Sequence, residues 1–319
     1  MKIFGLSILA GAMAWPAPAC DVCAVYSATQ AHGEVGKGFF TGVAEQFTHF
    51  GTLQEEGVEM PNVPGQFLDS SIAQVFVGYN FNDRIGVQFT LPIVHRSFRR
   101  ADDSGTIQTG RVSGIGDSWL ASHFVLLNKE KKKYTFRWSA LAGLKFPTGN
   151  SSRLEEETDE LTAPPRPGAP ESGIHGHDLT LGSGSVDGVM GTGVFARWQR
   201  VFLTGAVQYT IRSKGDFEYH FANDLTWLGG PGFFVALHDE YSVRLQAAVS
   251  GEHKKRDTLM GMTAEDTGLT AVYVGPQLRF TWSDKLSADL GVDLPVSINN
   301  TALQIVPDYR VRAGLTWHF

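Results

Sequence analysis

Hydrophobic and polar residues alternate along the last stretch of the chain, from Asp308 to Phe319. One set of alternate positions is apolar and consists of Tyr309, Val311, Ala313, Leu315, Trp317 and Phe319. The other set holds Arg310, Arg312, Gly314, Thr316 and His318. A period of two is typical of a β-strand whose two faces meet different surroundings. The pattern therefore predicts a terminal strand with one apolar face and one charged face.

The same alternation recurs upstream and predicts about twelve strands. They cover residues 38–50, 72–81, 85–93, 114–127, 134–146, 185–199, 201–211, 222–237, 241–253, 272–282, 286–298 and 309–319. Many of these stretches have ten or more residues, whereas strands of soluble proteins average about five or six. About ten tilted residues are enough to cross the hydrocarbon layer of a membrane. The strand lengths therefore favour a transmembrane β-barrel.

The connections between the strands support this architecture. Turns after the even-numbered strands are short, and those after the odd-numbered strands are mostly longer, with the connection near residue 300 as the exception. An up-and-down barrel with both chain ends in the periplasm has this parity. We therefore predict an all-β fold, an antiparallel up-and-down transmembrane β-barrel over residues 38–319, with the long loops on the outside.

The charged residues on the strands decide which face is which. An arginine on the lipid face near the middle of the membrane costs about 2–4 kcal/mol, so the charged faces should point into the barrel. This argument predicts eight lumen-lining residues: Arg310, Arg312, Asp289, Asp293, Arg244, Arg279, Arg137 and Asp117. Aromatic residues that we expect in the girdles at the membrane interfaces are Tyr309, Trp317, Trp282, Trp138 and Tyr134.

Bulk composition neither indicates nor excludes a membrane protein. Charged residues make up 19% of the chain and hydrophobic residues 42%, close to the averages of soluble proteins. A barrel gives such averages because lipid-facing apolar residues alternate with lumen-facing polar ones. The net charge of −6 implies no basic face, so we expect no nucleic-acid partner.

The first residues predict export. Lys2 precedes an apolar run over residues 3–15, and Ala17-Pro18-Ala19 has the small-x-small form of a signal-peptidase site. The run is too short to span a bilayer, so we expect residues 1–19 to be a cleaved signal peptide. Lipid attachment at Cys20 is disfavoured, because Ala17 stands where a leucine-like residue is usual. Residues 20–37 then form a short extension before the barrel, and the bacterial outer membrane is the expected destination.

Cys20 and Cys23 are the two cysteines of the chain. In an oxidising compartment a C-x-x-C pair suggests a disulfide, a redox pair or half of a metal site. The second ligand pair of a structural zinc site and the histidine that haem attachment requires are both missing. A disulfide is the favoured reading, with metal as the alternative. If the extension enters the lumen, the pair could stiffen a plug.

His175, His177 and Asp178 have side chains suited to a divalent transition metal. They belong to the longest loop, residues 147–184, which also carries the acidic run Glu155 to Glu160. We favour the reading of a solvated acidic loop with incidental histidines, and we keep metal binding as the alternative. Beyond this divalent metal the sequence predicts no cofactor.

Catalytic motifs are not evident, so we expect that the protein is not an enzyme. Gly114-x-Gly116 opens a strand rather than a helix, unlike a dinucleotide fingerprint. Asp117 and His123 lie on one face but about 20 Å apart along an extended strand. The sequence also contains no serine-elbow motif.

Several short motifs resemble a known family of outer-membrane proteins. They are Gly114-Ile115-Gly116-Asp117, Gly143-Leu144-Lys145-Phe146-Pro147-Thr148-Gly149, Gly182-Ser183-Gly184-Ser185-Val186-Asp187, Leu294-Pro295-Val296 with Asn299-Asn300, and the final strand. In this order they resemble the MetA-pathway of phenol degradation family, over about residues 38–319. The longer, more acidic loop at 151–173 and the C-x-x-C pair depart from that pattern.

The resemblance implies an outer-membrane channel or transporter for small molecules. The family name does not by itself identify phenol as the substrate. We therefore expect passive passage of a small solute, hydrophobic or aromatic solutes included. Expected partners are outer-membrane lipid and lipopolysaccharide, the barrel-assembly machinery and the solute itself. The alternatives are a metal-handling or redox-linked barrel and, less favoured, an outer-membrane enzyme.

Overall fold

The computed structural model describes residues 37–102, 106–162, 170–283 and 285–319. The predicted signal peptide, Cys20, Cys23 and the predicted extension up to residue 36 lie outside the described residues. The predictions about them therefore stay predictions.

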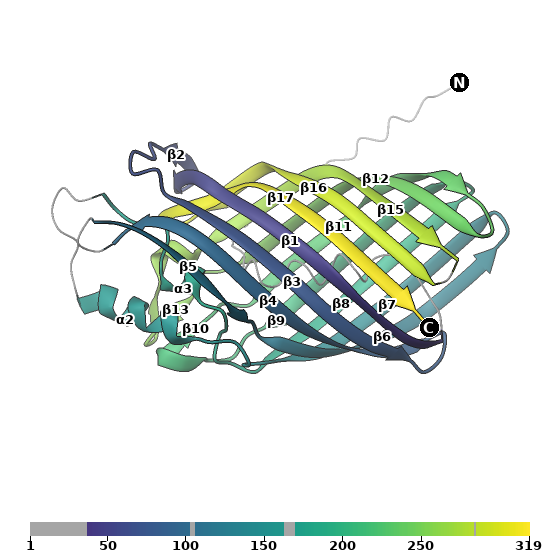
Figure 1. Cartoon of the computed structure of the whole chain (residues 1–319), viewed down its shortest axis with the longest axis horizontal. Coiled ribbons are helices and arrows are strands. Elements are labelled where there is room, and N and C mark those ends of the chain that lie inside the picture. The colour runs from purple at the N-terminus through teal and green to yellow at the C-terminus, as the bar shows by residue number, and fades with distance from the viewer. Residues whose placement is uncertain (1–36, 103–105, 163–169, 284) are drawn as a thin grey trace, which may run out of the picture.

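Twelve strands form one closed antiparallel barrel within the described part of the chain (Figure 1). They are β1 (Gly38–Glu55), β3 (Phe67–Asn80), β4 (Ile85–Ala101), β6 (Ser118–Lys131), β7 (Tyr134–Phe146), β8 (Asp187–Trp198), β9 (Val201–Ile211), β11 (Asp224–Leu237), β12 (Tyr241–Lys254), β15 (Leu269–Trp282), β16 (Leu286–Asn300) and β17 (Leu303–His318). Each strand pairs with its neighbours along the chain, and β17 pairs with β1, for example Phe40 with His318, to close the ring. The predicted fold is thus confirmed.

Smaller elements lie at one end of the barrel. β2 (Val58–Met60) folds back on β1, and β5 (Ile107–Ile115) pairs with β4. A separate sheet contains β10 (Tyr219–His220), β13 (Thr258–Leu259) and β14 (Met262–Thr263). The helical elements are η2 (Ser152–Leu154), α2 (Glu155–Thr162), α3 (Gly176–Leu179), η3 (Asp216–Glu218) and η4 (Glu265–Thr267). No helix in the described ranges is long and apolar enough to cross a bilayer.

The two ends of the barrel differ, as the predicted parity requires. β1 starts and β17 ends at the end where all the connections are short, such as Gln199-Arg200 and Lys132-Lys133. We call this the short-turn end. The other end, which we call the long-loop end, carries the long connections and one short exception, Thr301-Ala302 between β16 and β17.

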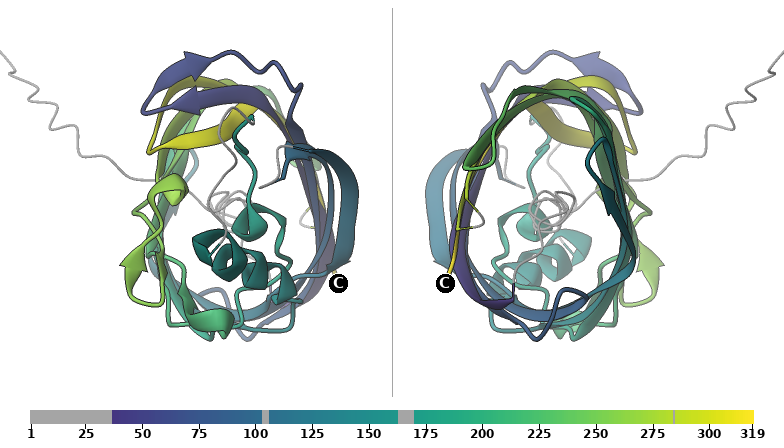
Figure 2. Two further views of the ribbon diagram at one scale, coloured as in Figure 1. Left: turned by 90° about the vertical axis from the view of Figure 1, so that its left-hand side faces the viewer. Right: turned by 90° about the vertical axis from the view of Figure 1, so that its right-hand side faces the viewer.

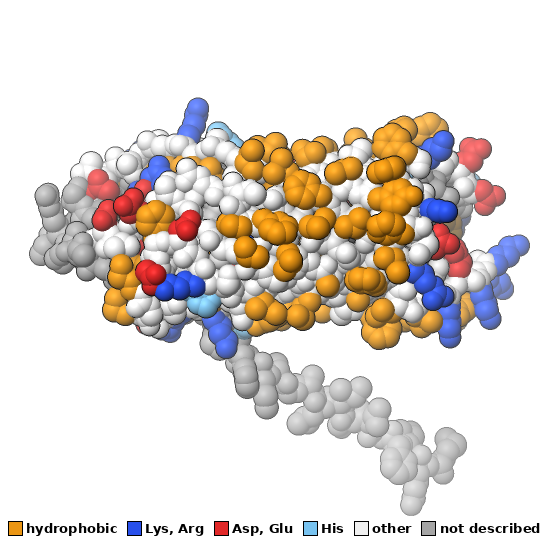
Figure 3. All heavy atoms as spheres, turned by 90° about the horizontal axis from the view of Figure 1, so that it is seen from below, with side chains coloured by type: hydrophobic (Ala, Val, Ile, Leu, Met, Phe, Trp, Pro, Cys, Tyr) orange, Lys and Arg blue, Asp and Glu red, His pale blue; other side chains and the backbone are white. Residues whose placement is uncertain are grey.

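The outer face of β4 marks where the apolar surface stops. Its outward residues are first apolar, from Ile85 through Phe89 to Ile93, and then become polar at His95, Ser97 and Arg99. Phe89 and Ile93 are 41% and 47% exposed, as expected for side chains that meet lipid rather than water. Figure 3 shows hydrophobic side chains spread over the barrel wall, with charged side chains gathered toward its two ends.

This boundary explains an error in the predicted strand ends. β1 runs to Glu55 rather than to residue 50, β3 begins at Phe67 rather than at 72, and β4 continues to Ala101 rather than to 93. Beyond the boundary both faces of a strand can be polar, so the alternation fades while the hydrogen-bonded pairing continues. The strands therefore reach past the expected membrane layer at the long-loop end.

The predicted strand 114–127 is wrong as a single element. β5 ends at Ile115 and β6 starts at Ser118, with Gly116 and Asp117 between them. At this break the Gly116 amide donates a hydrogen bond to the Pro92 carbonyl of β4, 2.9 Å away. At Gly116 the chain therefore stops pairing with one part of β4 and begins to pair with another. Asp117 lies in this break and binds the loop that folds over it.

A second error concerns the end of β16. Ile298 continues the apolar alternation of the predicted strand 286–298 and should therefore face outward, but it packs against Leu269, Tyr273 and Val306 inside the barrel. The register of β16 against β15 shifts between Ser297 and Pro295, which face Val272 and Tyr273. A bulge of this kind moves the following side chains to the opposite face.

The predicted aromatic girdle is matched at the short-turn end. Trp282 and Trp317 lie at the ends of β15 and β17 and are 53% and 42% exposed, and Tyr134 starts β7. Tyr309 lies nearer the middle of β17 than a girdle position requires. It is instead stacked on His49 of β1, with ring centroids 5.5 Å apart.

Candidate functional site

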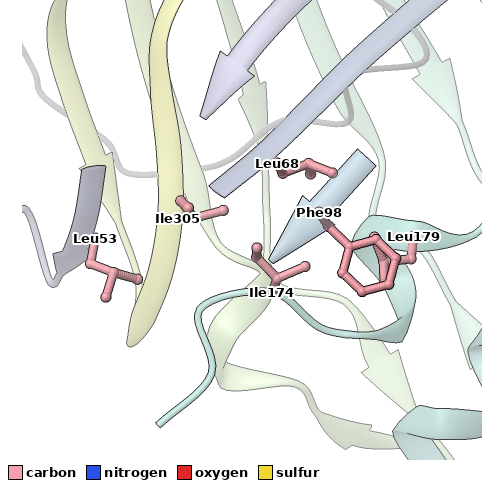
Figure 4. Packing of buried hydrophobic residues seen from close by; sticks show 6 residues of the cluster. All are labelled: Leu53, Leu68, Phe98, Ile174, Leu179 and Ile305. Carbon is pink, nitrogen blue, oxygen red and sulfur yellow. The ribbon is translucent and has the colours of Figure 1, made fainter. Parts of the chain in front are cut away.

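The longest connection joins β7 to β8, and its described residues, 147–162 and 170–186, fold over and into the long-loop end of the barrel. We call these residues the inward loop. Seen along the barrel axis, its helices lie within the outline of the ring of strands (Figure 2), and the side view places α2 at the mouth of the long-loop end (Figure 1). Ile174 and Leu179 pack on three inward side chains of the wall, Leu68, Phe98 and Ile305 (Figure 4). Burial of these apolar groups holds the loop in place. The prediction of a solvated loop is therefore wrong around Ile174 and Leu179, whereas Glu155 and Asp159 of the acidic run are exposed as predicted.

A short helix sets the geometry of the loop. His175 caps α3, and its backbone amide donates to Asp178 Oδ2 at 2.9 Å. Ile174 and Leu179 flank this turn, so both apolar side chains reach the wall from the same small element. Arg96 of β4 donates to the Thr180 carbonyl directly after the helix, at 2.5 Å.

The two histidines of the loop are largely shielded from solvent, with 16% of the His175 side chain and 7% of the His177 side chain exposed. His177 Nδ1 lies 2.9 Å from Glu157 Oε1, and His177 Nε2 lies 3.4 Å from Asp178 Oδ1. His175 Nε2 lies 3.3 Å from Asp266 Oδ2 in η4. Burial by itself would lower the pKa of the His177 imidazole, but the carboxylates of Asp178 and Glu157 outweigh this effect and raise that pKa well above its usual value.

The ion pairs of the two histidines thus join α2, α3 and η4 at the long-loop end. The His175 and His177 rings stack with centroids 5.9 Å apart, which brings the pairs together. Within the described residues, no group of three or more histidine, cysteine or acidic side chains has the arrangement of a metal site. Metal binding by His175, His177 and Asp178 stays a prediction.

A chain of alternating charges lies beneath the inward loop. Lys145 Nζ is 2.6 Å from Asp117 Oδ2 and 2.8 Å from Asp187 Oδ2. Arg212 continues the chain, at 3.1 Å from Asp187 and 2.7 Å from Asp224. All five side chains are buried. Buried charges are tolerated when each has partners of opposite sign, as here.

Asp117 also fastens the loop to the wall. Its Oδ2 accepts hydrogen bonds from the Ser183 amide at 2.9 Å and from Ser183 Oγ at 2.8 Å. Its Oδ1 accepts one from the Gly149 amide at 3.1 Å. Because Gly149 and Ser183 lie near the two ends of the inward loop, one carboxylate holds both.

A second group of charges adjoins the first, since Lys254 of this group stands opposite Asp224 in the register of β11 and β12. Asp257 accepts hydrogen bonds from Tyr219 Oη at 2.8 Å and from the Ala222 amide at 2.7 Å, and it is paired with Lys254. Burial and the neighbouring Asp257 carboxylate raise the pKa of Tyr219 well above its usual value. Tyr219 therefore stays a neutral donor, and it stacks on His177 of the inward loop at 6.3 Å.

The predicted residues of the last three strands form ion pairs within the barrel. Arg310 Nη2 lies 2.6 Å from Glu252 Oε1, and Arg312 Nη2 lies 2.8 Å from Asp293 Oδ1. Arg279 Nε lies 3.4 Å from Asp289 Oδ1. The pairs of Arg279 and Arg312 connect directly opposite or diagonal positions of adjoining strands, where long side chains can reach each other. Arg310 of β17 instead pairs with Glu252 of β12, two strands beyond its neighbour β16.

Arg244 has aromatic neighbours at the short-turn end. Its guanidinium carbon lies 5.7 to 5.9 Å from the ring centres of Phe195, Phe202 and Phe234. Cations are attracted to the faces of such rings. Arg137 of β7 is buried and stands opposite Phe195 in the register.

The eight predicted residues therefore all have side chains on the inner face, and they fall into three groups. Asp117 belongs to the network under the inward loop. Arg310, Arg312, Asp293, Arg279 and Asp289 lie along β15 to β17, and Arg244 and Arg137 lie toward the short-turn end. Asp289 is the most accessible, with 13% of its side chain exposed. That these groups line the path of a solute remains a proposal.

One cavity opens between the inward loop and the wall, and a second, smaller one lies between the barrel strands. The larger has a volume of about 90 Å³ and is bordered by the loop residues His177 to Ser183 and by wall residues that include Arg96, Lys145 and Arg310. The smaller, of about 10 Å³, is bordered by Gln46, Asp293, Arg312 and again Arg310. Arg310 therefore stands in the walls of both.

Sequence reasoning missed several partners of the predicted residues. Lys145, Arg212, Glu252 and Asp257 are all buried and paired. They lie near strand ends or in the connections, where the alternation is weakest. A search for charged residues within the last inward positions of each strand would have found Lys145 and Glu252.

No family model matches the sequence, and no curated protein matches it. The chain is similar in structure to the COG4313 outer membrane channel from Pseudomonas putida F1, with a TM-score of 0.63 and 14% identity over 90% of this chain and 98% of that one. It also matches, more distantly, the translocator domain of the autotransporter NalP from Neisseria meningitidis, with a TM-score of 0.42 and 12% identity over 92% of each chain. A FadL homologue from Pseudomonas aeruginosa has a TM-score of 0.33 and 12% identity over 88% of this chain and 89% of that one. At such identities the first likeness shows the fold, and we conclude that the chain has the twelve-stranded barrel architecture of an outer-membrane protein.

Proposed function

We propose that the protein is an outer-membrane channel through which a small solute passes down its concentration gradient. The observation that carries this proposal is the division of the wall: an apolar outer surface that stops sharply on β4 after Ile93, and an inner surface of paired charges around two cavities. The similarly folded Pseudomonas putida protein is described as an outer membrane channel, which supports the same reading.

The outer surface fits a lipid environment. Each arginine on the lipid face near mid-membrane would cost about 2–4 kcal/mol, and Arg279, Arg310 and Arg312 are all buried inside. In this proposal the wall contacts outer-membrane lipid, and lipopolysaccharide surrounds the long-loop end. The barrel-assembly machinery would insert the chain, with the short-turn end in the periplasm.

The inner surface fits slow, selective diffusion. Paired charges of both signs hold water and polar solutes without a strong net field, which favours entry without trapping the solute. Some buried polar atoms, among them Gln74 Nε2 and Gln208 Nε2, have no partner among the described residues, and in this proposal buried water would satisfy them. The inward loop narrows the passage at the long-loop end.

Planar-bilayer recording on the purified, folded, full-length protein tests the proposal. We expect discrete unitary currents, and we expect Asp293→Asn to shift the reversal potential toward anion preference because it removes a buried inner carboxylate. Asp239→Asn, in an exposed turn, is the matched control and should shift it less. Absence of any unitary current from a folded, heat-modifiable sample would refute the channel function.

A further inference from the structure

The larger cavity has an unusual charge balance. Among the described residues, its wall holds five arginine and lysine side chains: Arg96, Lys145, Arg212, Lys254 and Arg310. Four of them are paired, Lys145 and Arg212 with aspartates of the network under the loop, Lys254 with Asp257, and Arg310 with Glu252. The wall also holds the carboxylates of Asp117, Asp178 and Glu252, which lie against Lys145, His177 and Arg310 respectively.

Arg96 is the exception. It is 4% exposed, and its partners are neutral: Nη1 donates to the Thr180 carbonyl at 2.5 Å, and Nε donates to Ser70 Oγ at 3.5 Å. No carboxylate of the described residues lies within ion-pair distance of it. A buried guanidinium without a counter-charge is strongly unfavourable, and an anion in the adjoining cavity would relieve this cost.

The rest of the cavity wall is partly apolar. Leu68, Leu181 and Ile305 line it together with Arg96. Leu181 directly follows Thr180, and Leu68 is two residues from Ser70, so apolar side chains adjoin both contacts of the guanidinium. An anion that carries a short hydrocarbon chain would match both parts of the wall.

Size limits the ligand further. The cavity measures about 90 Å³, whereas a cavity of about 150 Å³ accommodates benzene. The cavity therefore limits the ligand to a few carbon atoms and excludes a long hydrocarbon chain unless the inward loop moves.

We propose that this cavity is a binding site for short-chain aliphatic carboxylates, with the carboxylate on Arg96 and the hydrocarbon chain against Leu68, Leu181 and Ile305. The proposal deepens the channel function and in part rests on it, since it names the class of solute that the lumen holds. A guanidinium binds a carboxylate through parallel charge-assisted hydrogen bonds, which a neutral amide cannot reproduce.

Ligand titration of the full-length protein in detergent tests the site, with butyrate and its uncharged analogue butyramide as probes. We expect butyrate to bind about tenfold more tightly than butyramide, the ratio typical of a hydrogen bond to a charged group. Arg96→Gln should reduce this ratio to about one, and Arg96→Lys should keep butyrate the better ligand. Arg99→Gln, on the exposed side of the same strand, is the matched control and should leave the ratio unchanged.

Equal affinity of the wild type for both probes would overturn the proposal, and this measurement does not depend on how Arg96→Gln affects the loop. An unchanged ratio in Arg96→Gln would overturn the role of Arg96. Equal affinity for chloride and butyrate would overturn the role of the apolar wall. Bilayer recording on the same sample separates the two proposals. Currents from a sample that binds butyrate no more tightly than butyramide contradict the binding site alone. A sample that binds butyrate more tightly than butyramide but gives no current contradicts the channel alone.

Discussion

The guanidinium carbon of Arg310 lies 4.3 Å from the centre of the Tyr273 ring, and both side chains donate to the same oxygen of Glu252. The arrangement places a cation, a ring and a carboxylate from three strands at the boundary between the two cavities. It gives Arg310 a structural role in addition to the lumen-lining role that we propose for it.

Removal of Arg310 alone should destabilise the barrel. We expect Arg310→Met to lower the free energy of unfolding by about 3–5 kcal/mol, because Glu252 would stay buried without its cation. Denaturant unfolding in detergent micelles, followed by tryptophan fluorescence, measures the change. The double variant Arg310→Met, Glu252→Gln should recover most of the loss. A neutral effect of the single variant would contradict the pairing.

The same position should also control conductance. Arg310 borders both cavities, so shortening its side chain joins them. We expect Arg310→Ala combined with Glu252→Gln to raise the unitary conductance in planar bilayers above that of the wild type. Exposed Arg99 provides the comparison, and Arg99→Ala should leave the conductance as it is. A lower conductance in the double variant would speak against a narrowing at Arg310.

The hold on the inward loop should weaken at alkaline pH. The pKa of His177 is raised in the folded protein by Asp178 and Glu157. Its contribution is therefore complete below its ordinary pKa, about 6.5, and is lost as the pH rises through the raised value. Hydrogen exchange of residues 170–182, corrected for intrinsic rates, should show protection that falls over this upper range.

His177→Gln is the control for this pH dependence. Glutamine cannot gain or lose the proton, so the corrected protection of the loop in this variant should be lower at neutral pH and should change less with pH. Protection that is the same at acidic and alkaline pH in the wild type would contradict the assignment.

The membrane boundary on β4 predicts a contrast between two substitutions on one face. Phe89 lies in the apolar part of the outer face and Ser97 in the polar part. We expect Phe89→Arg to cost about 2–4 kcal/mol in lipid and Ser97→Arg to stay within about 0.5 kcal/mol. Unfolding in lipid vesicles measures both. Equal costs would mean that the boundary is misplaced.

Much of the barrel follows from the sequence because alternation is strongest where lipid faces one side of a strand. The residues from Tyr309 to His318 take the two predicted faces over their whole length. The same contrast placed Arg279 and Asp293 inside. Where lipid ends, at His95 on β4, the contrast disappears, and the strand ends were predicted too short.

The inward loop could not be predicted in the same way. Its acidic residues indicate solvent exposure, and only Ile174, Leu179 and Leu181 indicate burial. Their partners, Leu68, Phe98 and Val94, come from strands far away in the chain. Arg96 escaped notice because it lies beyond Ile93, in the part of β4 where both faces carry polar groups.

Phe202 lies over Gly232 of the neighbouring strand, and the fit leaves no room for a methyl group. A Cβ at Gly232 would come within 2.1 Å of the Phe202 ring. We expect Gly232→Ala to destabilise the barrel by about 1–3 kcal/mol through the displaced ring. Gly205→Ala is the matched control, because nothing lies within 4 Å of its Cβ position. It should be neutral or stabilising by up to about 1 kcal/mol.

The pairing of β1 with β17 has a consequence for the order of folding. Partners such as Phe40 and His318 are separated by almost the whole chain, so their contact has the highest loop-closure entropy of the barrel. Until β17 is in place, β1 presents an open row of backbone donors and acceptors that can recruit another chain. We expect this seam to form last, and a chain truncated before Leu303 should aggregate through the exposed edge of β1.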